Sequence, residues 1–119
     1  MQIIVVDNNL QALSELKEAV RSVFPGSTIT GFTDPLLAVK HCMNFAPDLV
    51  FSEQDLKYLD GFSLLKLLLQ KHSSLRGILL SEDDGWRKDA ANLMLDFIQK
   101  PITSDKITAW KLQTEEEEP

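Results

Sequence analysis

Short apolar runs alternate with amphipathic segments along the whole chain. The first run, residues 2–6, is almost wholly β-branched, which is typical of a strand buried on both faces. The segment that follows carries apolar residues at spacings of three and four, which places them on one face of a helix: Leu13, Leu16, Val20 and Phe24. The chain therefore begins with a predicted strand and a predicted helix.

The same alternation recurs four more times. Further apolar runs predict strands at residues 28–33, 49–51, 78–80 and 97–98. The segments between them predict a helix that Asp34-Pro35 opens, a helix that follows the turn at Asp60-Gly61, a weaker helix over residues 84–94, and a last helix from near Ser104. Five strand–helix units joined by right-handed crossovers predict an α/β fold with a doubly wound, five-stranded parallel sheet.

Length and composition fit a single domain. A chain of 119 residues can bury roughly two-thirds of its unfolded surface, and its apolar fraction of 44% is that of an ordinary globular protein. Near the end, Glu115 to Glu118 form a run of like charges, which is typical of a solvated segment. We therefore expect one domain over residues 1–112 and an acidic linker or tail over residues 113–119.

Charge and hydropathy exclude several classes of function. A net charge of −6 without a basic cluster argues against direct nucleic acid binding. The chain has no apolar run of 18 residues that could span a membrane, and its first apolar run is too short for a signal peptide. A single cysteine, Cys42, cannot form an internal disulfide. Together these features predict a cytoplasmic location.

Polar side chains follow the predicted strands. In doubly wound sheets the binding site lies at the carboxyl ends of the strands, where the strand order reverses. The residues expected there are Asp7, Asn8, Glu53, Ser81 and Lys100. Carboxylates can hold Mg²⁺, while a hydroxyl and a lysine can steady phosphoryl oxygens. Any one of these residues could be an ordinary solvated loop residue, but five at predicted strand ends favour a pocket of the phosphoryl-transfer type.

Over about residues 2–110 the sequence resembles the receiver domains of two-component response regulators. The segments that carry the resemblance are IIVVDNN, FTDPLLAV, PDLVFSEQDLKYLDGFSLL, ILLSE and DFIQKPI. The resemblance implies a flavodoxin-like (βα)5 fold and a role in signal transduction. It also implies partners of two kinds, a histidine kinase and an output domain that is attached or separate.

The resemblance fixes the register of the site. Receivers carry a phosphoacceptor aspartate seven residues before an Asp-Gly pair, and Asp60-Gly61 therefore assigns the acceptor position to Glu53. Receivers also carry two adjacent acids after the first strand, and the second of these is replaced by Asn8. Ser81 and Lys100 match the family pattern, whereas Glu82 stands where a small residue is usual.

The same resemblance identifies Phe97 as the aromatic residue that swings on activation, although a single strand aromatic can equally be plain core. The face formed by the helix at 84–94, the strand at 97–98 and the last helix is then expected to pair with a second copy of the chain. Isologous dimers are the commonest assembly of this kind.

The departures from the pattern point to weak or absent phosphorylation. The carboxylate of Glu53 lies about 1–1.5 Å further out than that of an aspartate, and a misplacement of that size costs roughly a hundredfold in an in-line attack. Asn8 keeps an oxygen but loses the charge that Mg²⁺ favours. We expect that Asp7, Asn8 and Glu53 bind Mg²⁺ weakly or not at all, and that the chain is not an enzyme.

Three alternatives for Glu53 stay open at this point. Its carboxylate could reach Ser81 or Lys100 and imitate the phosphorylated state. It could instead neutralise Lys100 without switching anything. In the third alternative the chain is a working, Mg²⁺-dependent phosphoacceptor receiver with an unusual site.

Overall fold

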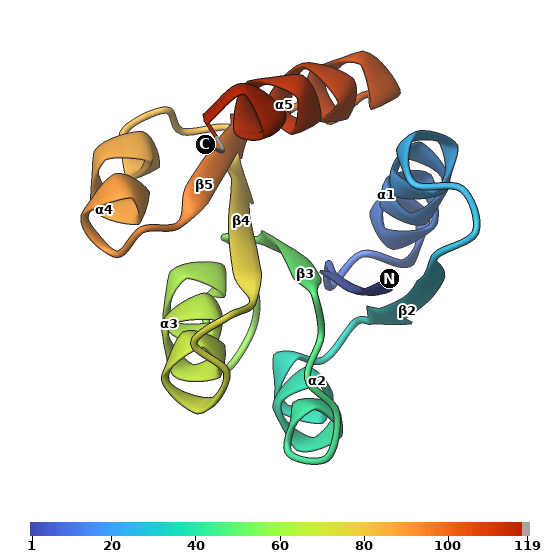
Figure 1. Ribbon diagram of the computed structural model, residues 1–119. Coiled ribbons are helices and arrows are strands. Elements are labelled where there is room, and N and C mark those ends of the chain that lie inside the picture. The colour runs from blue at the N-terminus through green and yellow to red at the C-terminus, as the bar shows by residue number, and fades with distance from the viewer. Residues whose placement is uncertain (118–119) are drawn as a thin grey trace.

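The computed structural model describes residues 1–117, with the side chains of residues 1–115. Five parallel strands form one sheet in the order β2-β1-β3-β4-β5 (Figure 1). The strands are β1 (Gln2–Val6), β2 (Thr28–Phe32), β3 (Leu49–Glu53), β4 (Arg76–Ser81) and β5 (Asp96–Gln99). The helices are α1 (Leu10–Val23), α2 (Pro35–Cys42), α3 (Gly61–Lys71), α4 (Trp86–Asn92) and α5 (Ser104–Glu117).

Helices cover both faces of the sheet, and each face has its own apolar core. One core joins α1 and α5 to the sheet through residues such as Leu16 and Ile107, and Phe51 of β3 is fully buried in it. The other joins α2, α3 and α4 through residues such as Leu64 and Ala90. Figure 1 shows α1 and α5 on one side of the strands and α2 and α3 on the other. Because both faces are covered, the central strands need the continuous apolar runs seen in the sequence.

The predicted α/β fold is confirmed, and the element bounds differ from the prediction chiefly at α4. A helix is predicted over residues 84–94, whereas α4 spans Trp86–Asn92. Gly85 precedes it and has no side chain that could cap the helix. At the other end Met94 adopts a left-handed conformation with φ of 60°, which a helix cannot continue through.

The last helix is longer than its apolar pattern predicts. α5 runs to Glu117, so residues 113–117 of the predicted acidic linker or tail are helical, and residues 118–119 lie outside the described residues. Trp110 anchors α5, because its ring is buried and its Nε1 donates a hydrogen bond of 2.9 Å to Asp96 Oδ2 on β5. That the acidic segment links this domain to another stays a prediction.

Candidate functional site

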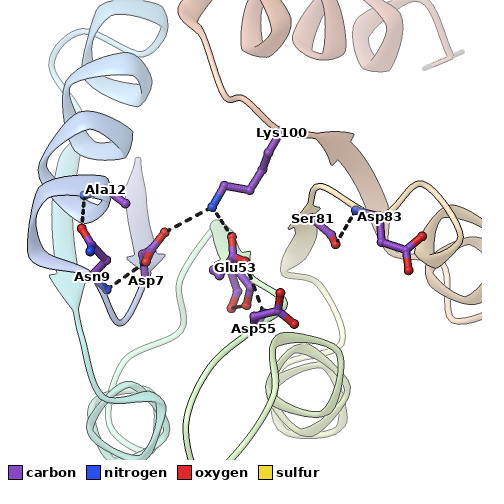
Figure 2. Close-up of polar contacts among 9 residues, drawn as sticks. Asp7, Asn9, Ala12, Glu53, Asp55, Ser81, Asp83 and Lys100 are labelled. Atoms are coloured by element: carbon purple, nitrogen blue, oxygen red, sulfur yellow. Dashed lines mark hydrogen bonds and ion pairs between the residues drawn. The ribbon is translucent and has the colours of Figure 1, made fainter.

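Three strands bring their carboxyl ends together where the strand order reverses. β1 lies between β2 and β3, so successive crossovers leave it in opposite directions. Asp7 directly follows β1, Glu53 is the last residue of β3, and Lys100 directly follows β5. Figure 2 shows the three side chains converging above these strand ends. This is the location that the switch-point rule predicts for a binding site.

Lys100 stands between the two carboxylates. Its Nζ lies 2.6 Å from Glu53 Oε2 and 3.8 Å from Asp7 Oδ2. The side chains are well shielded, with 23% of Lys100, 9% of Glu53 and 6% of Asp7 exposed. Salt screens such a pair far less than it screens a surface ion pair, so the charges interact strongly.

Backbone amides complete the contacts of both carboxylates. The amide of Asp55 donates to Glu53 Oε1 at 3.3 Å, and the amide of Asn9 donates to Asp7 Oδ1 at 3.0 Å. Each carboxylate therefore turns one oxygen towards a backbone N–H and the other towards Lys100 (Figure 2). This arrangement fixes the orientation of both side chains.

The pKa values of the central pair follow from burial and pairing. Burial raises the pKa of Glu53 above its ordinary value, and the hydrogen bond and charge of Lys100 only partly offset that effect. Burial alone would lower the pKa of Lys100. The pKa of Lys100 is nevertheless raised, because the effect of burial is outweighed by the hydrogen bond to Glu53 and by the negative charges of Glu53, Asp7 and Glu82. Lys100 is thus held firmly as an ammonium.

A close backbone approach fixes the position of Glu53. A Cβ atom on Gly61 would lie 2.2 Å from the carbonyl oxygen of Glu53, so α3 can begin here only with glycine. The amide of Gly61 donates to the carbonyl of Gln54 at 3.0 Å, and the amide of Phe62 donates to the side-chain oxygen of Gln54 at 2.8 Å. Gln54 is a positioning residue that the sequence reasoning missed, because nothing in a single polar residue after a strand indicates this contact.

Ser81 and Asn8 lie beside this group rather than within it. The hydroxyl of Ser81 is buried and accepts a hydrogen bond of 3.0 Å from the amide of Asp83, so its observed bond is not to Glu53 (Figure 2). Asn8 is exposed and lines a cavity of about 430 Å³ together with Asp7 and Glu53. Of the five predicted pocket residues, the structure joins Asp7, Glu53 and Lys100 by direct contacts.

Comparison with known proteins identifies the family. Residues 3–110 match the response regulator receiver domain family. The chain belongs to this family. It is therefore a receiver domain of the two-component signalling type, and receivers are generally signalling modules that interact with kinases and output domains.

Individual relatives agree with this assignment. The chain is 26% identical over 114 residues to the cyclic di-GMP phosphodiesterase response regulator RpfG of Xanthomonas campestris pv. campestris (strain 8004), covering 92% of this chain and 30% of that protein. The receiver domain of an HD domain-containing protein from Pseudomonas fluorescens Pf-5 superposes with a TM-score of 0.80 at 24% identity, covering 96% of this chain and 85% of that one. The chemotaxis response regulator CheY4 of Vibrio cholerae superposes with a TM-score of 0.78 at 14% identity, covering 94% of this chain and 95% of that one.

Phe97, which the sequence predicts to be a switch residue, is half-buried. Phe97 packs against the core on the α2, α3 and α4 side, and the guanidinium of Arg87 lies 4.8 Å from the centre of its ring. Arg87 is itself held by Asp84, whose Oδ1 accepts its Nε–H at 2.9 Å. The ring of Phe97 therefore packs between the apolar core and Arg87 of α4. Its role as a switch stays a prediction.

This receiver offers a small donor set to a magnesium ion. Receivers typically bind Mg²⁺ at their phosphorylation site. Among the residues that the structure describes, no group of three or more His, Cys, Asp or Glu side chains is placed to hold a metal. Asp7 and Glu53 are two carboxylates with an ammonium between them, and Asn8 offers a neutral amide. Mg²⁺ usually keeps several waters and binds through one or two carboxylates, so these donors are compatible with weak binding.

Within residues 1–117, none of the helices combines the length and the apolar composition needed to cross a membrane.

Proposed function

We propose that this receiver is atypical: it regulates its output through protein contacts, without the usual Mg²⁺-dependent phosphorylation. The observation that carries the proposal is the 2.6 Å contact between Lys100 Nζ and Glu53 Oε2. In a phosphorylated receiver the lysine would have to be available to an incoming phosphoryl group. Here its charge is already matched by the residue at the acceptor position.

The chemistry of the acceptor position supports the same conclusion. A glutamate carboxylate is displaced by about 1–1.5 Å relative to an aspartate, which costs roughly a hundredfold in a reaction that needs in-line attack. The raised pKa of Glu53 reflects a carboxylate held in a shielded place. Asn8 removes an anionic ligand for the metal that would assist the reaction. We propose that neither catalysis nor strong Mg²⁺ binding resides in this domain.

Two accounts of Glu53 involve no phosphorylation, and we propose the one in which Glu53 only neutralises Lys100. Imitation of the phosphorylated state calls for Glu53 to reach Ser81 or Lys100 and for Phe97 to lie inward. Glu53 meets Lys100, but Ser81 bonds to the amide of Asp83 and the ring of Phe97 is only half-buried. These contacts favour a neutralised resting pair over an imitation of the phosphorylated state.

Partners follow from the family and the charge. We propose protein partners, namely a histidine kinase or an attached or separate output domain, in the cytoplasm. A net charge of −6 gives no support for direct contact with nucleic acid. The phosphodiesterase activity in the name of the Xanthomonas relative belongs to a protein of which this chain spans 30%, so it is not assigned to this domain.

The test is uptake of a phosphoryl group. The purified chain is incubated with acetyl phosphate and Mg²⁺, and bound phosphoryl is measured by intact mass; in parallel, beryllofluoride is added and amide NMR shifts are recorded. The proposal expects no acyl-phosphate and no shifts at Glu53, Ser81 or Lys100. Stoichiometric phosphorylation at Glu53, or shifts centred on these residues, would make the chain a working phosphoacceptor receiver instead.

A further inference from the structure

Exposed apolar side chains gather on α2 and α3. Ten large apolar side chains are exposed among residues 1–115, and five of them, each between 43% and 62% exposed, lie on these helices or just after α2. The five are Leu36, Leu37, Met43, Phe45 and Leu67. Exposed apolar side chains that gather in one place mark interaction sites, whereas scattered ones need no explanation.

On α3, helical geometry turns Leu67 towards α2. α3 lies between α4 and α2 (Figure 1). The ring of Phe62 packs against Trp86 of α4, with ring centres 5.5 Å apart, and Leu67 lies about 140° further round the helix. The two helices are also joined directly, because the imidazole Nε2 of His72, at the C-cap of α3, lies 2.6 Å from the carbonyl oxygen of Cys42.

The matching flank of α2 is apolar too. His41 packs against Phe32 of β2 with ring centres 5.3 Å apart, so this flank faces the edge of the sheet. Leu36 and Met43 are about two helical turns apart and lie on the opposite flank, towards α3. The imidazole of His41 also stacks on the exposed ring of Phe45, with centres 4.8 Å apart. These contacts order the surface before any partner binds, which lowers the cost of binding.

The charge of this surface is opposite to that of the chain. Residues 35–47 and 61–75 contain no Asp or Glu, in a chain with a net charge of −6. The acids that border these segments, Asp34, Asp48 and Asp60, each accept a hydrogen bond from a backbone amide. Three exposed lysines lie within the segments, and in the part of the chain that the structure describes none of them is in an ion pair: Lys40, Lys66 and Lys71. We call these lysines and the five apolar residues the α2–α3 face.

We propose that the α2–α3 face binds an acidic amphipathic helix of a partner protein. The apolar stripe of such a helix would cover the exposed leucines, methionine and phenylalanine, and its acidic flanks would meet the lysines. The inference rests on the proposed function, since it names the chemistry of a partner through which the receiver acts. An anionic membrane fits less well, because it binds clusters of about four to eight basic residues and would repel a chain of net charge −6.

The experiment begins with a display library of random peptides about four helical turns long, selected on the wild-type chain. We expect the enriched peptides to be net acidic, with apolar residues at spacings of three and four. The best peptide is then synthesised, and its dissociation constant is measured by fluorescence anisotropy. Lys40→Glu/Lys66→Glu should weaken its binding by about tenfold or more. The matched control is Lys57→Glu/Lys88→Glu, which reverses two exposed lysines outside α2 and α3 and should leave binding unchanged.

A second pair of variants tests the apolar part of the face. Leu67→Ser should also weaken binding, whereas Leu10→Ser, at an exposed leucine of α1, should leave it unchanged. All substituted side chains are exposed, and circular dichroism checks that each variant keeps its fold. Binding should weaken further as salt is added, because the charges of the face are exposed to solvent.

Three results would overturn the inference. One is a selection that enriches no acidic amphipathic peptide. Another is equal affinity of the best peptide for wild type and Lys40→Glu/Lys66→Glu, since the peptide would then bind elsewhere. The third is sedimentation of the wild-type chain with vesicles of phosphatidylglycerol and phosphatidylcholine, lost in Lys40→Glu/Lys66→Glu, when no acidic peptide is enriched. That result would assign the face to a lipid surface.

This test is separable from the test of function. Uptake of a phosphoryl group from acetyl phosphate would overturn the proposed function, whatever peptides the wild-type chain selects. A chain that takes up no phosphoryl group and selects no acidic amphipathic peptide would lose only the α2–α3 face as a docking surface. None of the residues of this face belongs to α4, β5 or α5.

Discussion

At the scale of single residues, the site differs from the family pattern by the extra methylene of Glu53 and by the missing negative charge at Asn8. Glu53 extends far enough to hold Lys100 at 2.6 Å, and its other oxygen is occupied by the amide of Asp55. Asn8 stays exposed at the rim and leaves Asp7 as the single acid after β1. Both changes act on the same metal-assisted step, so their effects on phosphorylation should be coupled.

The first prediction is that Glu53→Asp alone restores little acceptor activity, because Asn8 still supplies no negative charge to the metal. The double variant Asn8→Asp/Glu53→Asp should be phosphorylated by acetyl phosphate faster than the sum of the two single variants allows. Phosphoryl incorporation over time in all four chains measures this coupling. Robust phosphorylation of the single Glu53→Asp variant would show that Asn8 does not limit the site.

The second prediction concerns the pH dependence of stability. Because burial raises the pKa of Glu53 in the folded state, the folded chain holds this proton more tightly than the unfolded chain does. The contribution of Glu53 to the free energy of unfolding is therefore largest below its ordinary pKa and falls as the pH rises through its folded pKa. In urea unfolding, the free energy of unfolding of wild type should fall relative to that of Glu53→Gln as the pH rises from the ordinary pKa of Glu53 to its folded pKa. From the folded pKa to neutral pH the difference should stay constant.

The exposed Glu15→Gln change on α1 controls for the loss of one carboxylate. Lys100 stays protonated throughout this range, since its pKa is raised and its contribution is lost only at strongly alkaline pH. A difference that moves instead in favour of wild type as the pH rises would mean that pairing with Lys100 outweighs the burial of Glu53.

The structure brings some of the residues predicted for the site together, but the sequence did not indicate most of their contacts. The Asp-Gly register assigned the acceptor position to Glu53, and contact with Lys100 was one of the alternatives left open. The bond from the amide of Asp83 to Ser81 and the role of Gln54 as a loop clamp depend on the path of the backbone. No residue type at a single position encodes such a path, so the sequence could not indicate these contacts.

At the scale of elements, strands and capped helices were predictable because each has a local cause. Asp34 accepts a hydrogen bond from the amide of Leu36 at 2.9 Å, and Asp60 accepts one from the amide of Ser63 at 2.8 Å, so α2 and α3 begin where their caps indicate. α4 has a glycine at its cap position and was correspondingly predicted too long. The helix with the weakest capping signal, α4, is thus the helix whose predicted bounds differ most from the observed ones.

The third prediction uses two glycines as a matched pair. Gly61→Ala would bring a Cβ within 2.2 Å of the backbone oxygen of Glu53, which cannot move without shifting β3. Gly77→Ala would meet Leu95 Cδ2 at 2.8 Å, and that atom is the far end of a flexible side chain. We expect Gly61→Ala to lower the free energy of unfolding by about 3 kcal/mol or more, and Gly77→Ala by roughly 1 kcal/mol. Equal costs in urea unfolding would contradict the close approach at Gly61.

At the scale of the whole molecule, the edge formed by α4, β5 and α5 is the face that the sequence predicts to be an interface. Surface cavities of about 270 and 320 Å³ lie along it and share Arg87, Phe97, Trp110 and Gln113 in their walls. We call these two cavities together the groove, and both aromatic and polar side chains line it. Aromatic and arginine side chains are enriched in protein interfaces, so this groove suits a protein partner.

The last prediction is that a second copy of the chain occupies this face in an isologous dimer. An isologous contact uses the same patch twice, so one substitution there acts on both sides of the interface. Ala109 on α5 is exposed in the groove, and Ala109→Arg would place two bulky charges at the contact. Sedimentation velocity over a concentration series should show association of wild type, weakened by about tenfold or more in Ala109→Arg. Ser14→Arg, at an exposed position of α1 that lines neither cavity, should leave association unchanged. A wild-type chain that stays monomeric throughout the series would refute the dimer and leave the groove to a different protein.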